Sequence, residues 1–444
     1  MNYTDLTQKL MEKALKMGAD AAEIYLETGR SLSVNILNKE IETIEESTSS
    51  GIGVRVIVGG AVGFSFSNNF QSGALDETIA SAIRFARLTT PADYNILAGQ
   101  MPSTAVDGLY DPGIFKVSME KKIEMALELE KLAMSDKRIT KSAGSSYGEE
   151  DSEVFICNSN GILKSYKSSG CYIGVNVVAE KNDQKETGSE SCSRRYFADL
   201  LSLDEVAAKA SMNAWEMLDC RMVKTQKAPV IFDPDIARSL FGGVISALDG
   251  ERVLKGASFL RDSLEKQIAM SQITIIDDGV STRRLASAPF DAEGVPTQRR
   301  ALIENGIVKG FIYNTSAAKR AGTASTGNAS RGGYTSLPGI GTHNLILEPG
   351  TMKREEIISS TKRGLLLKGL TGYGIDPVTG NFSGGASGLW IENGEIAFPV
   401  EGITIAASAD HILNSIDMIG NDIDLNRTFA APTFRVAEMQ IGGE

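Results

Sequence analysis

Residues 52–66 read I-G-V-R-V-I-V-G-G-A-V-G-F-S-F and decide how the first part of the chain folds. Apolar residues alternate up to Val58, Gly59-Gly60 interrupt them, and the alternation resumes at Val62. Alternation of period two buries one face of a strand, and paired glycines supply the positive backbone angles of a tight turn. The segment therefore predicts a β-hairpin.

Helical patterns flank this hairpin, and the layout recurs further along the chain. Amphipathic periodicity predicts helices over 4–17 and 75–88, with four strands between them. A second unit follows, with helices over 118–134 and 204–218 and strands near 152–157, 162–168 and 171–179. We therefore predict an N-terminal α/β domain over residues 1–225, built from two helix-strand halves.

Beyond the polar stretch 221–228 the chain is rich in glycine and tight turns. Asn305-Gly306 and Asn393-Gly394 each join two strand-like runs, which is the signal of a type I′ hairpin. We predict a second, β-rich and mainly antiparallel domain over residues 226–444, which makes the fold class α+β.

The composition argues against two classes of function, nucleic-acid binding and membrane insertion. The 444 residues carry a net charge of −11 with lysine and arginine scattered, whereas binding to DNA requires a concentrated cationic surface. No segment has the roughly 18 apolar residues of a membrane-spanning helix, and the charged N-terminal helix is unlike a signal peptide. We expect a cytoplasmic protein that binds neither nucleic acid directly nor a membrane.

The chain has only two histidines, His343 and His411, and four cysteines without a CxxC pair. A metallopeptidase helix needs two imidazoles on one face and a glutamate beside the first. The sequence excludes such a helix and predicts no metal site. We interpret His411 as structural. His343 lies beside a glycine-rich loop, so it is either structural or a substrate contact.

Two further segments are dense in polar groups. Residues 289–300 place Asp291, Glu293, Arg299 and Arg300 around a turn. These four are either exposed ion pairs of small energy or a clamp for the termini or backbone of a peptide. Residues 322–341 form a long loop of small residues, which is typical of functional or mobile segments. No GxSxG motif and no GxxxxGK[ST] phosphate loop occurs.

Three ordered segments resemble one family. They are S-A-P-F-D-A-E-G-V-P-T-Q-R-R-A-L-I-E-N-G-I-V at 287–308, G-N-F-S-G-G-A-S-G-L-W-I-E-N-G-E at 380–395, and G-N-D at 420–422. These are similar to signatures of the TldD/TldE (PmbA) peptidases, also called modulators of DNA gyrase. The similarity covers the chain and is densest after residue 228.

The resemblance implies a strongly curved, β-rich C-terminal domain and a dimer whose cavity admits unfolded peptides as extended strands. TldD-type subunits hold zinc with an HExxxH helix and a late cysteine. Here those positions are occupied by Phe241, Gly242, Ser246 and Ala431. The chain therefore resembles the TldE/PmbA-type subunit, with no cofactor of its own and zinc only in a TldD-type partner.

Three functions remain open at this stage. The first is a non-catalytic subunit that completes the cavity of a TldD/TldE-type metallopeptidase. The second is a homodimer that binds peptides without hydrolysis. The third is a hydrolase that uses a Ser, Thr or Cys nucleophile.

Overall fold

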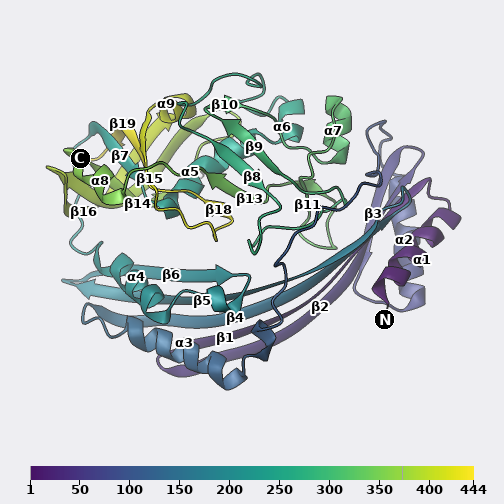
Figure 1. Cartoon of the computed structure of the whole chain (residues 1–444), viewed down its shortest axis with the longest axis horizontal. Helices are drawn as coiled ribbons and strands as arrows, with labels where there is room; N and C mark the ends of the chain where they lie inside the picture. The colour runs from purple at the N-terminus through teal and green to yellow at the C-terminus, as the bar shows by residue number, and fades with distance from the viewer. Residues whose placement is uncertain (1, 373) are drawn as a thin grey trace.

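The computed structural model describes residues 2–372 and 374–444. The N-terminal part forms a long, curved sheet, and the C-terminal part lies over the concave side of that sheet (Figure 1). Long strands accumulate the right-handed twist of a β-sheet, so strands of 17 to 20 residues curve strongly. The fold class is α+β, as the sequence predicts, and the strongest curvature lies in the N-terminal sheet.

The N-terminal part consists of two halves with the same order, a helix, three strands and a helix. The first half comprises α1 (Tyr3–Lys16), β1 (Ala21–Leu37), β2 (Glu40–Val58), β3 (Ala61–Ser67) and α2 (Ser72–Ala86). The second comprises α3 (Met119–Ala133), β4 (Ile139–Asn158), β5 (Leu163–Lys181), β6 (Gln184–Arg194) and α4 (Leu203–Trp215). The short 3₁₀ helices η1 (Ile114–Lys116) and η2 (Phe197–Asp199) flank α3 and β6.

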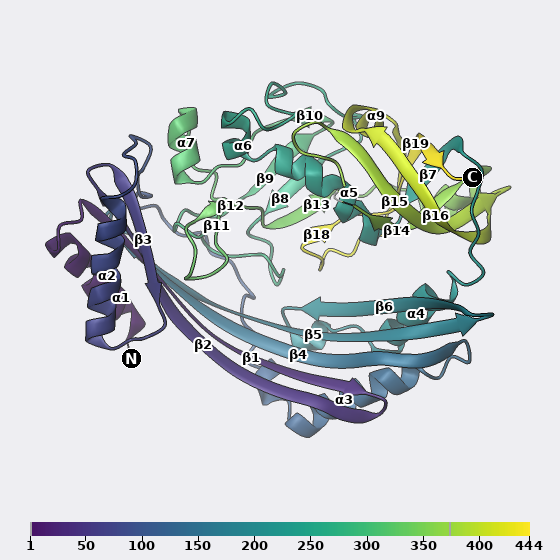
Figure 2. The ribbon, with the colours of Figure 1, turned by 180° about the vertical axis from the view of Figure 1, so that it is seen from behind.

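The six strands form one antiparallel sheet in the order β3-β2-β1-β4-β5-β6. The two halves therefore meet along β1 and β4, and their edge strands are β3 and β6. Each half has its own core: α1 and α2 cover one end of the sheet, and α3 and α4 cover the other. Figure 2 shows both helix pairs from behind.

The predicted 52–66 hairpin is confirmed as β2 and β3, with Gly59 and Gly60 at positive φ. Two strand predictions were wrong. Three strands, not four, lie between the first two helices, because β1 and β2 are each much longer than the average strand. Residues 162–168 and 171–179 belong to the single strand β5, since Gly170 continues the ladder instead of breaking it. Strand β6 was missed because its alternating residues are mostly polar.

The C-terminal part contains two larger sheets. One has the order β10-β9-β8-β13-β18, from β8 (Ile275–Asp278), β9 (Arg299–Glu304), β10 (Ile307–Val308), β13 (Asn344–Leu347) and β18 (Phe429–Ala430). The other has the order β16-β15-β14-β7-β19-β17, from β7 (Gln226–Phe232), β14 (Arg363–Thr371), β15 (Asn381–Glu392), β16 (Glu395–Ser408), β17 (Ile416–Ile419) and β19 (Phe434–Gly442). A small pair joins β11 (Ala329–Ser330) to β12 (Gly339–Ile340).

Pairing is mainly antiparallel, with β13–β18 and β14–β7 parallel. The two predicted asparagine-glycine turns are confirmed between β9 and β10 and between β15 and β16. Helix α5 (Pro234–Ala247) packs in one core with residues of both sheets. The remaining helices are α6 (Gly250–Leu254), α7 (Thr315–Ala321), α8 (Arg354–Ser359) and α9 (Ala409–Asn414). No helix of the described residues is long and apolar enough to cross a membrane.

Candidate substrate cleft

A cleft of about 970 Å³ lies between the β6 end of the curved sheet and the C-terminal part. Strands β5 and β6 and helix α4 form one wall. The opposite wall consists of the start of α5, strand β14 and the segment that leads from β17 into β18. Its volume lies within the range of sites that hold extended or drug-sized ligands.

Charged side chains cross this cleft in pairs. The Lys209 ammonium lies 2.7 Å from Glu190 and 3.3 Å from Asp235, and Arg427 lies 3.3 Å and 3.0 Å from the same two carboxylates. Burial works against the charge of Lys209, but Glu190 and Asp235 together raise its pKa above the ordinary value. Arg238 is an exposed part of the lining and has no carboxylate partner among the described residues. The cleft therefore offers one cation for binding.

The outer edge of β6 faces this cleft. Within the described part of the chain strand β6 pairs with β5 alone, and residues 186–191 line the cavity. The N–H of Ser191 donates to Glu190 Oε1 at 3.0 Å, and the carbonyl of Ser189 accepts from Asn213 Nδ2 at 3.0 Å. These bonds show that Ser189 and Ser191 point their backbone groups away from β5. Side chains occupy only part of this edge, so it retains donors and acceptors for an additional strand.

Helix α5 carries the positions at which the resemblance places zinc ligands. Phe241 is fully buried, and its ring centroid lies 6.3 Å from that of Phe429 in β18. Gly242 is exposed and Ser246 is half-buried. Ala431, two residues after Phe429, is buried against the cleft. None of the four supplies the nitrogen, sulfur or carboxylate ligands that zinc prefers.

One group of metal-ligand type does occur among residues 2–372 and 374–444. Glu186, Cys220 and Glu401 place their ligand atoms within 4.8 Å of one another, and Glu186 and Glu401 also line the cleft. The Cys220 thiol donates to Glu401 Oε2 at 3.2 Å, and burial together with this carboxylate raises the pKa of Cys220 to about 11. Sequence spacing did not reveal this group, because its members come from three distant segments.

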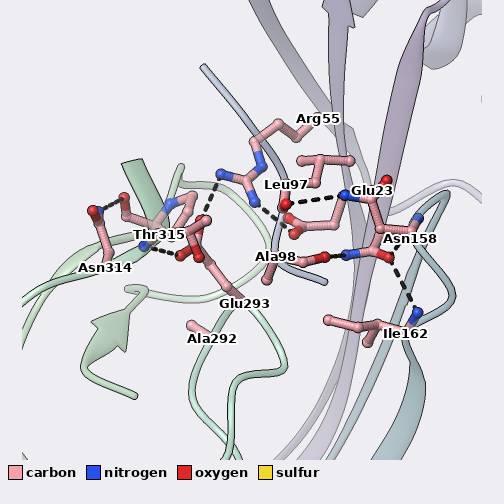
Figure 3. Close-up of polar contacts among 12 residues, drawn as sticks. Glu23, Arg55, Leu97, Ala98, Asn158, Ile162, Ala292, Glu293, Asn314 and Thr315 are labelled. Carbon is pink, nitrogen blue, oxygen red and sulfur yellow. Dashed lines mark hydrogen bonds and ion pairs between the residues drawn. The ribbon is translucent and has the colours of Figure 1, made fainter. Parts of the chain in front are cut away.

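Glu293 lies in a buried ion network between the two parts of the chain (Figure 3). Arg55 Nη1 lies 2.9 Å from Glu293 Oε1, and its Nη2 lies 2.6 Å from Glu23 Oε2. Arg331 pairs with the other oxygen of Glu23, and the Thr315 N–H donates to Glu293 Oε2 at 2.8 Å. Glu23 and Glu293 are fully buried. We call these two glutamates and two arginines the interdomain lock.

The lock balances two negative and two positive charges away from water. Burial opposes the charge of Arg55, but Glu23 and Glu293 outweigh it and raise the pKa of Arg55. Burial likewise opposes the charge of Glu23, but Arg55 and Arg331 lower its pKa. Beside the lock, Asn158 Nδ2 donates to the Ala98 carbonyl at 2.9 Å and fixes the linker between the halves (Figure 3).

Asp291 organises the turn next to Glu293. Its Oδ1 accepts from the N–H groups of Glu293 at 2.8 Å and Val295 at 3.0 Å, and its Oδ2 accepts from Ala329 at 2.9 Å. Burial and the charge of Glu293 raise the pKa of Asp291 to about 7, although these N–H bonds lower it. All four oxygens of Asp291 and Glu293 thus have donors within the protein. Substrate contact through either residue stays a prediction and requires these bonds to open.

The other predicted site residues gather at the β8–β9 ladder. Arg299 pairs with Asp278 at 3.2 Å and its side chain is 55% exposed, whereas Arg300 lies opposite Asp277 and is half-buried. His343 donates its N–H to Asp277 Oδ1 at 2.7 Å, and its Nδ1 lies 3.2 Å from Asp277 Oδ2. Arg300 and His343 thus lie beside the same residue, Asp277, whereas Arg299 pairs with Asp278 on the next rung, where side chains point to the other face of the sheet. Whether they bind substrate stays a prediction.

The loop over 322–341 connects these two sites. Asn328 Nδ2 donates to Asp277 Oδ2 at 2.7 Å, Ala329 bonds to Asp291, and Arg331 pairs with Glu23. The ring of Tyr334 lies over Gly51 of β2, where a Cβ atom would come within 2.2 Å of it. Gly51 therefore gives Tyr334 of this loop room to pack closely against the curved sheet.

Comparison with known proteins places the chain in a family. Three family profiles match: PmbA/TldA metallopeptidase domain 1 over residues 22–86, the central domain over 112–218 and the C-terminal domain over 225–443. The metalloprotease PmbA of Escherichia coli O157:H7 is 31% identical, and the alignment covers 100% of this chain and 98% of the relative.

Two solved structures are similar over nearly the whole chain. TldE from Thermococcus kodakarensis has a TM-score of 0.89 at 25% identity and covers 98% of this chain and 99% of its own. A Thermotoga maritima protein, named as a modulator of a DNA gyrase, has a TM-score of 0.89 at 25% identity, with 99% and 100% covered. With three matching domains and a 31% identical relative of full length, the chain belongs to the PmbA/TldD family of metallopeptidases.

Proposed function

We propose that this chain is a TldE/PmbA-type subunit that acts in the proteolysis of unfolded peptides without hydrolysing them itself. In this proposal it dimerises with a TldD-type subunit in the cytoplasm and completes the substrate cavity. Zinc is held by the partner alone. Any link to DNA gyrase is then indirect, through a peptide substrate, since the chain has a net charge of −11 and its lysines and arginines are scattered along the sequence.

The observation that carries the proposal is the free edge of β6 on the wall of the cleft. An extended peptide that adds to a strand edge is bound through its main chain, so many sequences are accepted. The exposed Arg238 in the same cleft offers a cation for the carboxylate of a peptide terminus. Both features suit a protein that holds unfolded peptides in an extended form.

The chemistry of α5 supports the absence of hydrolysis. Peptide hydrolysis by a metallopeptidase requires a metal-activated water and a general base. Phe241, Gly242 and Ser246 provide neither, and Phe241 is committed to the core.

The chain's histidines do not replace this machinery. His411 Nε2 bonds to the Glu438 carbonyl at 2.7 Å. The ring of His343 bonds to Asp277, and no hydroxyl or thiol of the described residues bonds to it. A nucleophilic hydrolase needs contact between a nucleophile and its base. We therefore favour the subunit over the nucleophilic hydrolase.

A proline at one position of the β6 edge tests the proposed binding mode. Ser189→Pro removes an N–H that points away from β5, so the sheet keeps its own ladder. Ser189→Ala is the matched control, because it removes the hydroxyl and keeps the N–H. Binding of a fluorescein-labelled unstructured peptide is measured by anisotropy. We expect Ser189→Pro to abolish binding and Ser189→Ala to preserve it. Equal affinity of the two variants would refute strand addition at β6.

A further inference from the structure

A second strand edge of the curved sheet is free, and it faces away from the cleft. Strand β2 pairs with β1 along its whole length, but β3 covers only its second half, from Ile52 to Val58. Residues 40–51 have no strand on their outer side within the described part of the chain. Residues 40–49 are exposed throughout. An open edge of this length is a template for pairing with another chain.

Both ends of the free edge are held in place. At the far end, the buried carboxylate of Glu130 accepts the N–H groups of Asn38 at 3.0 Å and Lys39 at 2.7 Å. At the near end, the β2–β3 ladder begins at Ile52. The edge is therefore extended in advance, so a partner strand would not have to order it.

The edge also exposes apolar surface. Ile41 is 48% exposed and Ile44 is 43% exposed, although their neighbours on β1, Ile36 and Val34, are fully buried under α3. The apolar face of the core thus continues to the edge without cover. Edge strands that are protected against aggregation typically carry charged residues or proline. Exposed isoleucines do not serve that purpose and instead favour contact with a partner.

The charges of the edge select its partner. Residues 40–49 read E-I-E-T-I-E-E-S-T-S, with four glutamates and no lysine or arginine. If two copies paired across a two-fold axis, a register centred on Ile44 would set Glu42 opposite Glu46. A register centred on Glu45 would set that residue opposite its own copy. Like charges in opposing positions destabilise a strand pair. Self-pairing is therefore disfavoured.

We propose that residues 40–49 of β2 form an edge-to-edge interface with a strand of a non-identical folded chain, one that carries lysine or arginine at alternate positions. This inference rests on the proposed function, because it assigns the contact with the second subunit to this edge. Two copies of this chain would then not assemble through it. The main-chain bonds supply the pairing, the isoleucines supply buried apolar area, and the glutamates supply selectivity.

A charge-reversed copy of the chain can serve as the partner in a test, because its edge strand carries lysines in place of the four glutamates. The copy carries Glu40→Lys, Glu42→Lys, Glu45→Lys and Glu46→Lys, and it is mixed with the wild-type chain. The control copy reverses four exposed glutamates of the C-terminal part, namely Glu304, Glu348, Glu355 and Glu395. Association is measured by analytical ultracentrifugation at low and high salt, and amide exchange is followed over residues 40–50.

We expect the mixture with the edge-reversed copy to associate at least about tenfold more tightly than the wild type alone or the control mixture. This gain in affinity should disappear at high salt. Amides of residues 40–50 should become protected only in that mixture. No gain in association, or protection of these amides in the wild type alone, would overturn the proposal.

A second arm uses the TldD-type subunit of the same host with the wild-type chain. Protection of residues 40–50 in that complex supports the interface, and a complex that leaves them unprotected overturns it. Failure of the TldD-type subunit to bind at all contradicts the proposed function, and the charge-reversed mixture then still decides on the edge.

Discussion

The two ends of the interface between the curved sheet and the C-terminal part use charge in opposite ways. At the lock, Glu23, Arg55 and Glu293 are almost completely removed from water, and each carboxylate oxygen has a donor. Near β6, Lys209 and Asp235 pair while each side chain stays 42% exposed. The first arrangement fixes the two parts of the chain, and the second leaves a hydrated cleft. Fixed structure and binding surface therefore lie at opposite ends of one interface.

Removing one member of the lock should give the largest loss of stability. Arg55→Ala leaves Glu23 and Glu293 buried near each other without that cation, which should cost about 3–5 kcal/mol in the free energy of unfolding. The matched control is Lys209→Ala in the cleft, where we expect a loss below about 1 kcal/mol, because Lys209 is 42% exposed and Arg427 still pairs with both of its carboxylate partners. Urea unfolding of the three proteins gives both values. Equal losses of stability in the two variants would contradict the difference between a buried ion network at the lock and a partly exposed one near β6.

Phe241 tests the packing behind the cleft. Phe241→Ala removes a fully buried ring that contacts β18, and we expect a loss of about 3–5 kcal/mol in the free energy of unfolding. Thermal unfolding measured beside the wild type is sufficient. Unchanged thermal stability would mean that α5 lies outside the core, contrary to the structure.

Asp291 should make the stability of the lock end depend on pH. Its pKa is raised from 3.8 to about 7 in the folded protein. Between these values the folded state keeps a proton that the unfolded state has lost, so this contribution to stability is full below about pH 4 and is lost as pH rises through 7. Asp291→Asn should therefore show a shallower decline between pH 5 and 8. An identical decline in both proteins would assign the slope to other groups.

The smallest expected effect is that of zinc on the isolated chain. We expect no stoichiometric metal after dialysis and no rise of the melting temperature with added zinc, since a ligand stabilises only the state that binds it. Elemental analysis and a thermal scan check both. About one bound zinc per chain would contradict the expectation, and its loss in Cys220→Ser would assign it to the Glu186–Cys220–Glu401 group.

The sequence predicted the parts of the fold that local pattern determines. The 52–66 hairpin and both asparagine-glycine turns follow from alternation and from residues that tolerate positive φ. Strand β6 was missed because serine and glutamate fill its alternate positions, so alternation in hydrophobicity is weak. The great length of β1 and β2, 17 and 19 residues, could not be foreseen either, because polar residues extend these strands well beyond their cores.

The sequence predicted a property of the site only where a missing residue type excludes a kind of chemistry. Two histidines far apart are enough to rule out an HExxxH helix. The environment of Glu293 was not predictable, because its partner Arg55 lies 238 positions earlier in the chain and Glu23, which shares that arginine, lies 270 positions earlier. A turn dense in charge looks the same in sequence whether water or another domain covers it. Only tertiary contacts distinguish the two.

The central claim is that this chain provides a peptide cleft and no hydrolytic chemistry, and turnover of a labelled unstructured peptide tests it most directly. The isolated chain should show no cleavage with zinc or other divalent metals. A mixture with the TldD-type subunit should cleave, and a chelator should abolish that cleavage. Chelator-resistant cleavage by the isolated chain, lost when a single serine, threonine or cysteine is replaced, would contradict the account and establish a nucleophilic hydrolase.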